Sequence, residues 1–181
     1  GLSVIDLEGL AKHRGSSFGG IEQIKQPTTE HFENILAKEL SLYEKQSIKA
    51  IWMEDESITL GKCRIPKNLF SQIKKAPLIE ITKHNHERIQ SLVKEYGKYQ
   101  QKELEEATLR ISKRLGPQRT SKAIKAIKEK NLEEACIEIL AYYDKCYEFS
   151  LAKIDNKQKI DLSDLDDHLA AEEFIKLTQI K

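Results

Sequence analysis

The sequence lacks the features of a membrane protein and of a disulfide-bonded scaffold. No apolar run approaches the length that spans a bilayer, and the N-terminal residues do not show the basic-then-apolar pattern of a signal peptide. Only three cysteines are present, Cys63, Cys136 and Cys146, and they form no C-x-x-C pair. We therefore expect a cytoplasmic protein with no membrane contact, in which each cysteine is a free, buried thiol and no structural zinc is bound.

The sequence also has almost no net charge, because 30 Lys and Arg residues balance 29 Asp and Glu residues. Charge is nevertheless unevenly distributed. Residues 110–130 contain eight basic side chains and one acid, whereas residues 155–173 contain seven acids and two lysines. The basic stretch is a candidate surface for an anion or a nucleic acid. A solvated helix face is the alternative, and composition alone leaves both open.

The first part of the chain alternates between short apolar runs and amphipathic stretches. Apolar strands separated by helices are typical of a parallel sheet that is covered on both faces, so we expect an α/β fold. A proline precedes one of the helices, and a threonine is available to cap another. The expected strands are residues 2–7, 50–53 and 77–81, and the expected helices are residues 30–43 and 66–75.

After residue 86 the pattern changes to almost uninterrupted helix. We expect helices over 89–96, 104–115, 121–130 and 131–146, the last of them capped by Asn131. A strand at 159–162 then leads through Ser163 or Asp164 into a final helix. The predicted organisation is an α/β core over 1–85, a helical insertion over 86–153, and a returning strand and C-terminal helix of the core over 154–181.

Four of the eight glycines lie between Leu7 and Gly20, beside a His13–Arg14 pair and two serines. This stretch directly follows the first expected strand. A glycine-rich loop in that position brings backbone N–H groups close to a phosphate or another anion. A plain connecting loop also uses glycine, for positive φ angles. The stretch is therefore a candidate binding loop with a purely structural alternative.

An acidic run, Glu54-Asp55-Glu56-Ser57, follows the second expected strand. Parallel-sheet proteins bind ligands beyond the carboxyl ends of their strands. In phosphate-binding α/β folds a carboxylate at this edge holds Mg²⁺, directly or through water. A solvated strand end is the alternative. The acidic run and the glycine-rich stretch are expected to face the same crevice.

Five motifs together resemble one family, the tRNA 2-selenouridine synthases, in their C-terminal P-loop portion. The motifs occur in family order over about residues 1 to 153, and they are VIDLEGLAKHRGSSFG (4–19), QPT (26–28) with FEN (32–34), WMEDES (52–57), RLGPQR (114–119) and YYD (142–144). The resemblance implies a P-loop-NTPase-like parallel sheet with a large helical insertion. The sequence contains no G-x-x-x-x-G-K-[ST] motif. We therefore expect an incomplete sheet that lacks its first strand and P-loop.

The resemblance also implies a reaction. Members of this family convert 2-thiouridine at the wobble position of tRNA to 2-selenouridine with selenophosphate, through an S-geranyl-2-thiouridine intermediate made from geranyl diphosphate. They pair the P-loop portion with a rhodanese-like domain that carries a reactive cysteine. Since neither that domain nor the P-loop is found here, we expect a fragment that is inactive alone, with both parts on the same or a separate chain. No covalently bound cofactor is expected, and a role for Mg²⁺ is left open.

The leading hypothesis, a tRNA-modifying transferase fragment, assigns roles to individual residues. We rank Arg14 first in the loop, because a guanidinium grips phosphate with two hydrogen bonds. The catalytic candidates are His13, Arg14, Glu54, Asp55 and Glu56. The candidates for binding phosphate or substrate are Gly15, Ser16, Ser17, Gly19, Arg64, Arg114, Gln118 and Arg119, and those for binding tRNA are Arg110, Lys113, Lys122, Lys125 and Lys128.

Two other classes of function fit the same sequence. One is a kinase-like P-loop phosphotransferase that acts on a small molecule, with residues 86–153 as its lid. The other is a non-catalytic helical RNA-binding module that uses only the basic segment. A Walker lysine on an adjoining segment would favour the first, and tolerance of substitutions around Gly15 would favour the second.

Overall fold

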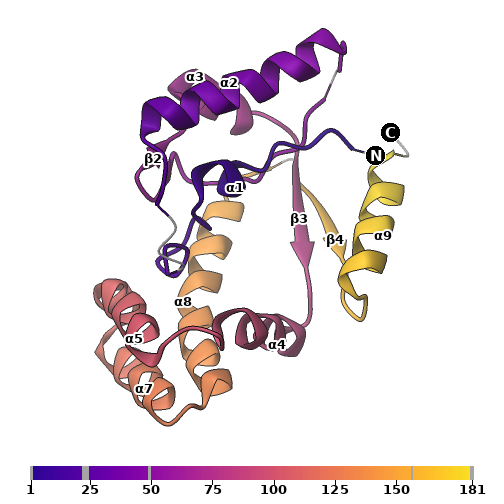
Figure 1. Cartoon of the computed structure of the whole chain (residues 1–181). Coiled ribbons are helices and arrows are strands. Elements are labelled where there is room, and N and C mark those ends of the chain that lie inside the picture. The colour runs from indigo at the N-terminus through magenta and orange to yellow at the C-terminus, as the bar shows by residue number, and fades with distance from the viewer. Residues whose placement is uncertain (1, 22–24, 49, 156, 180–181) are drawn as a thin grey trace. The chain divides into compact units, whose positions relative to one another are not determined.

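The computed structural model describes residues 2–21, 25–48, 50–155 and 157–179. The chain forms two compact units, Gly1–Ala76 and Pro77–Lys181, which are described separately below (Figure 1). The third expected strand belongs to the second unit, together with the helical segment and the returning strand. None of the helices in the described residues is both long and apolar enough to cross a membrane.

Unit 1 contains three helices and a short hairpin among its described residues. They are α1 (Leu7–Ala11), α2 (Thr29–Lys45), β1 (Thr59–Leu60), β2 (Cys63–Arg64) and α3 (Lys67–Ile73). The expected helices at 30–43 and 66–75 are thereby confirmed as α2 and α3. The Thr28 hydroxyl caps α2 by accepting a 3.1 Å hydrogen bond from the His31 N–H, and Pro66 directly precedes α3.

The first two expected strands are reduced to a single parallel bridge between Val4 and Trp52. The Ile5 N–H donates to the Trp52 carbonyl at 2.9 Å, and the Trp52 N–H donates to the Ser3 carbonyl at 2.8 Å. The prediction of a strand as far as residue 7 was wrong at its end, because Leu7 already begins α1. The physical reason is a helix cap on the preceding aspartate, described with the site below.

The β1–β2 hairpin was not predicted. Thr59 pairs with Arg64 and Leu60 with Cys63, and Gly61 takes a positive φ of 59° in the turn between them. The hairpin supplies buried side chains to the core of unit 1. That core consists of Ile5, Leu7, Ala11, Phe32, Leu36, Leu60, Cys63 and Ile65.

The helical part of unit 2 is organised around one long helix. Its described elements are α4 (Asn85–Tyr96), α5 (Gln101–Arg110), α6 (Ser112–Leu115), α7 (Pro117–Lys128) and α8 (Leu132–Leu151). Helices α4, α6 and α7 contact α8, and α5 packs against α7 (Figure 1). The Asn131 side chain accepts from the Glu134 N–H at 3.2 Å, which confirms the expected cap. The expected helix 104–115 is divided at Ile111, and α7 begins at Pro117 rather than at residue 121.

The other part of unit 2 is a parallel pair, β3 (Leu78–Thr82) and β4 (Lys157–Asp161), followed by α9 (Asp167–Gln179). Ile160, Leu162 and Ala170 form its buried core. Neither Ser163 nor Asp164 caps α9. The Asp166 carboxylate does, by accepting from the N–H groups of the two residues after Asp167 at 2.9 and 2.8 Å. In the described residues, then, the fold is α/β with mostly helices and a small parallel sheet.

Candidate functional site

The carboxylates after Trp52 reach the first turn of α1 within unit 1. Glu54 accepts hydrogen bonds from the N–H groups of Leu7 and Glu8, at 3.0 and 3.5 Å. The Asp6 carboxylate caps the same helix by accepting from the Gly9 N–H at 2.7 Å. Burial raises the pKa of Glu54, and the hydrogen bond from Leu7 opposes that rise. Asp6 and Glu54 therefore explain why the chain turns into a helix at Leu7.

Glu8 is a site residue that the sequence analysis missed. Its pKa is raised from 4.5 to about 7, first by burial and then by the adjacent Glu56 carboxylate, with further contributions from Glu54 and Asp6. Four carboxyl groups therefore gather where the two bridged segments end. The signal available in the sequence was an acid on each side of Leu7, directly after the apolar run.

The glycine-rich stretch closes on itself between Arg14 and Gly19. The Ser16 N–H donates to the Arg14 carbonyl at 2.7 Å, and the Arg14 N–H donates to the Gly19 carbonyl at 3.4 Å. A Cβ on Gly19 would lie 2.7 Å from the Arg14 backbone nitrogen, so this close approach requires glycine. The Ser16 hydroxyl accepts from the Phe18 N–H at 3.1 Å, a local turn contact. The Arg14 side chain is exposed.

The loop and the acidic run meet at Gly15. This residue has a φ of 65°, and a Cβ built on it would lie 2.5 to 2.8 Å from the carboxyl group of Glu56. The structure thus brings together the two segments that the sequence placed at a common edge. His13, next to the loop, has its ring 3.5 Å from the position of a Cβ on Gly20. Unit 1 therefore brings the loop backbone together with Glu56 and its neighbours Glu8 and Glu54, whereas His13 lies beside Gly20.

Two candidates of unit 1 lie in other surroundings. Asp55 forms an ion pair with Lys74, and both side chains are partly exposed. A pair of this kind is worth about 0–1 kcal/mol of stability. Arg64 lies in β2 with its side chain exposed. Asp55 therefore has a surface partner, whereas its neighbours in sequence face the glycine-rich stretch.

The basic segment of unit 2 is partly engaged by α8. Arg119 Nη1 and Lys122 Nζ donate to the two oxygens of Glu138, at 2.8 and 3.1 Å, and Glu138 is only 5% exposed. Arg114 Nη1 donates to the Tyr142 hydroxyl at 3.5 Å. Three of the cations predicted to bind substrate or tRNA thus hold α6 and α7 against α8.

Other basic residues of this segment point to solvent. Arg110, Lys113, Lys125 and Lys128 are exposed, as is the neutral Gln118, and Lys125 lies 3.8 Å from Glu129 in an (i, i+4) pair. Within the part of the chain that the structure describes, Lys113 and Lys128 form no ion pair. An open, mainly apolar groove of about 540 Å³ runs beside Lys113, with Leu109, Pro117 and Ile124 among its walls. These side chains form the candidate nucleic-acid surface.

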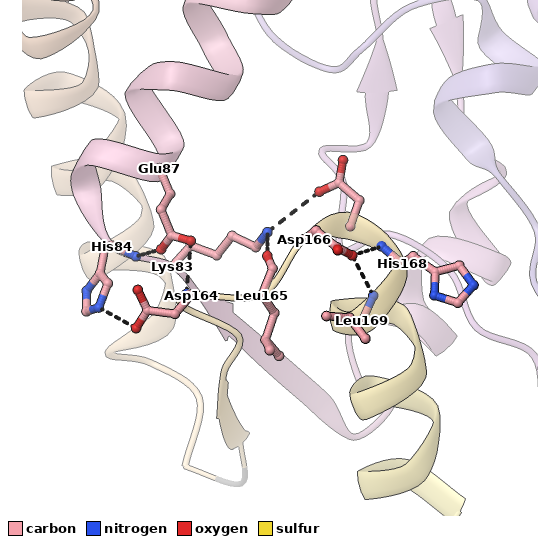
Figure 2. A network of polar contacts seen from close by, with 9 residues as sticks. Lys83, His84, Glu87, Asp164, Leu165, Asp166, His168 and Leu169 are labelled. Carbon is pink, nitrogen blue, oxygen red and sulfur yellow. Dashed lines mark hydrogen bonds and ion pairs between the residues drawn. The ribbon is translucent and has the colours of Figure 1, made fainter.

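A polar network at the carboxyl ends of β3 and β4 was not predicted (Figure 2). Glu87 accepts from the N–H groups of both His84 and Asp164, each at 3.0 Å. Lys83 Nζ donates to the Leu165 carbonyl at 3.0 Å and lies 3.6 Å from Asp167. His84 Nε2 lies 3.4 Å from the Asp164 carboxylate. Because these groups bind one another, the network fastens the loop after β3 to the loop after β4.

The three cysteines differ in burial, and none of them lies among the carboxylates described above. Cys63 is fully buried, and burial raises the pKa of its thiol. Burial also raises the pKa of Cys136 to about 11. Cys146 is exposed, so the prediction that every thiol is buried was wrong. Within residues 2–21, 25–48, 50–155 and 157–179, no group of three or more His, Cys, Asp or Glu side chains is arranged to hold a metal ion.

Comparison with known proteins connects this geometry to a class of domain. The sequence profile described as "tRNA 2-selenouridine synthase AAA domain" matches residues 2–173. A tRNA 2-selenouridine synthase of Hydrogenovibrio crunogenus is 33% identical over 89% of this chain and 50% of its own length. One of Shewanella woodyi is 31% identical over 81% of this chain and 48% of its own length. No solved structure matches.

An AAA-type domain is therefore the class that the profile defines, and the described residues have an α/β fold. Within that class, the chain belongs to the tRNA 2-selenouridine synthase family. It spans about half the length of the curated relatives that it matches over most of its own length. The five motifs fall within the matched residues, which confirms the resemblance drawn from them.

Proposed function

We propose that the chain takes part in converting 2-thiouridine at the wobble position of tRNA to 2-selenouridine, with selenophosphate as selenium donor. The observation that carries the proposal is the match of the synthase AAA-domain profile to residues 2–173. An S-geranyl-2-thiouridine intermediate, made with geranyl diphosphate, belongs to the same proposal. So do a cytoplasmic location and two working partners, a rhodanese-like domain and a P-loop segment on the same or a separate chain.

In this proposal unit 1 handles the phosphate-bearing substrate. The exposed Arg14 guanidinium can hold phosphate oxygens with two charge-assisted hydrogen bonds, beside a loop whose backbone is already closed at Gly19. Glu8 lies next to Glu56 with a pKa of about 7, which suits a group that gives or takes a proton at neutral pH. His13 is the second candidate for proton transfer. No step is assigned to Mg²⁺.

Unit 2 supplies the proposed contact with tRNA. Arg119 and Lys122 are bound to the buried Glu138, so we assign their main role to holding α7 on α8. The exposed cations outside that cluster are better placed to meet phosphates, and Lys113 and Lys128 are foremost among them. Phosphate contacts of this kind give affinity that falls as salt is added.

The experiment uses a chimera in which this chain replaces the matching half of the Hydrogenovibrio relative. The reaction starts from tRNA, geranyl diphosphate and selenophosphate, and the nucleosides are read by mass spectrometry. We expect selenouridine from the chimera and from the intact relative, none from the chain alone, and a loss of about ten- to hundred-fold on Arg14→Ala. An inactive chimera beside an active relative would contradict the proposal. Geranylated or selenated uridine from the chain alone would refute the proposal that the reaction needs the rhodanese-like domain and the P-loop segment.

A further inference from the structure

Gln26 uses its whole carboxamide to join two segments of unit 1. Its Nε2 donates to the Ala11 carbonyl at 2.8 Å and to the Leu60 carbonyl at 3.0 Å. Its Oε1 accepts from the Lys62 N–H at 2.9 Å. These hydrogen bonds from one side chain tie the end of α1 to the turn of the β1–β2 hairpin. Both joined segments flank His13, which lies two residues after Ala11.

The hairpin turn leaves room for the His13 ring only because residue 61 is glycine. A Cβ on Gly61 would lie 2.6 Å from His13 Cδ2 and 2.2 Å from Gln26 Oε1. The other contact is looser, since a Cβ on Gly20 would meet the ring at an ordinary 3.5 Å. The carboxamide cannot move aside without giving up its hydrogen bonds to the backbone. The ring is therefore confined by the turn and by the side chain that holds the turn.

We propose that Gln26 and Gly61 are positioning residues for His13. Gln26 fixes the distance between the end of α1 and the hairpin turn, and Gly61 provides the space in which the imidazole rests. The inference deepens the proposed function, and its catalytic consequence rests on the assignment of proton transfer to His13. The placement of the ring is a separate matter that can be measured without substrate.

The first measurement is nuclear magnetic resonance of the chain labelled at histidine and glycine. We expect nuclear Overhauser signals from His13 Hδ2 to the α-protons of Gly61 and Gly20 in the wild type. Gln26→Ala should abolish them, whereas Lys62→Ala, on an exposed side chain of the same turn, should leave them unchanged. Gln26→Glu keeps the acceptor for the Lys62 N–H but, when ionised, has no donor for the two carbonyls. Its spectrum should return towards that of the wild type as the added carboxyl group is protonated.

The second variant is Gly61→Ala, which keeps the Gln26 carboxamide. Gly116→Ala is its control, because Gly116 also has a positive φ, of 87°, but open space where a Cβ would lie. Backbone strain affects both variants, whereas a displaced His13 signal is expected only for Gly61→Ala. Spectra are recorded where tryptophan fluorescence shows unit 1, and circular dichroism at helical wavelengths shows unit 2, to be folded in each variant. If Gln26→Ala does not fold, the His13 signals of Gln26→Glu and Gly61→Ala decide whether the ring is positioned as proposed.

Activity of the chimera gives a third, independent measurement. A misplaced catalytic group costs up to about a hundred-fold, so we expect Gln26→Ala to lower kcat by about ten- to hundred-fold with a smaller change in KM. Unchanged His13 signals in folded Gln26→Ala and Gly61→Ala would overturn the positioning role. Abolished signals with undiminished kcat would overturn the catalytic consequence. An inactive wild-type chimera would count against the proposed function alone, since the resonance measurement stands without it.

Discussion

The buried Glu138 and its two cations predict an unequal response to removing either side of the cluster. Arg119 and Lys122 have side chains about half exposed, so water can solvate them if the carboxylate is removed. The Glu138 carboxylate is only 6% exposed, so water cannot solvate it if the two cations are removed. An uncompensated buried charge costs about 3–5 kcal/mol, whereas removing a hydrogen bond to a charged group costs about 1.5–3 kcal/mol.

We therefore expect the double variant Arg119→Ala/Lys122→Ala to destabilise unit 2 by about 3–5 kcal/mol. Glu138→Gln alone should cost about 1.5–3 kcal/mol, and adding it to the double variant should recover more than half of the loss. The assay is urea unfolding followed by circular dichroism at helical wavelengths. The fluorescence of Trp52, the single tryptophan, reports on unit 1 and is the internal control. No recovery in the triple variant would refute the argument that a stranded carboxylate causes the loss.

Three further predictions follow from the same structure. Lys113→Ala with Lys128→Ala should weaken tRNA binding and lower the salt slope by roughly 0.7–0.9 log units for each phosphate interaction removed, and Lys94→Ala on α4 should not. Asp55→Ala should cost less than about 1 kcal/mol of stability in urea unfolding, because its ion pair with Lys74 is at the surface. The raised pKa of Glu8, about 7, means that unit 1 loses stability as pH rises from about 4.5 to 7. Glu8→Gln should therefore be more stable than wild type near pH 8, with the gap closing near pH 4, as read by tryptophan fluorescence.

The helices were predictable where local signals agree. The apolar spacing of α2 coincides with the Thr28 cap, and that of α8 with the Asn131 cap, so each was found near its true start. Neither β1 nor β2 is longer than two residues, and such strands carry no periodicity. Helix α1 has only five residues, and one of the groups that stabilise it, Glu54, is 47 positions away. A contact of that range leaves no trace in a local pattern.

Part of the candidate site was also predictable from the sequence, and part was not. The sequence predicted that the glycine-rich stretch and the acidic run would meet, because each follows an expected strand. The close approach of Gly15 to Glu56 confirms this prediction. Which carboxylate would face the loop did not follow, because Asp55 pairs with Lys74, nineteen positions further on. The basic run likewise did not reveal that Arg119 would be held by an acid on another helix.

The pairing of β3 with β4 has a consequence for how the chain acquires its structure. The paired strands lie about eighty residues apart in sequence, and closing a flexible loop of that length costs on the order of 4 kcal/mol in chain entropy. Helix α4 directly follows β3 and α8 directly precedes β4, and these helices contact each other and are joined by Arg88 and Asp144. Once the helices have docked, the two strands are already close and most of that entropy has been given up. During synthesis on a ribosome, β3 cannot pair with β4 until residue 161 has emerged. The docked helices α4 and α8 hold β3 near the position where β4 will pair with it.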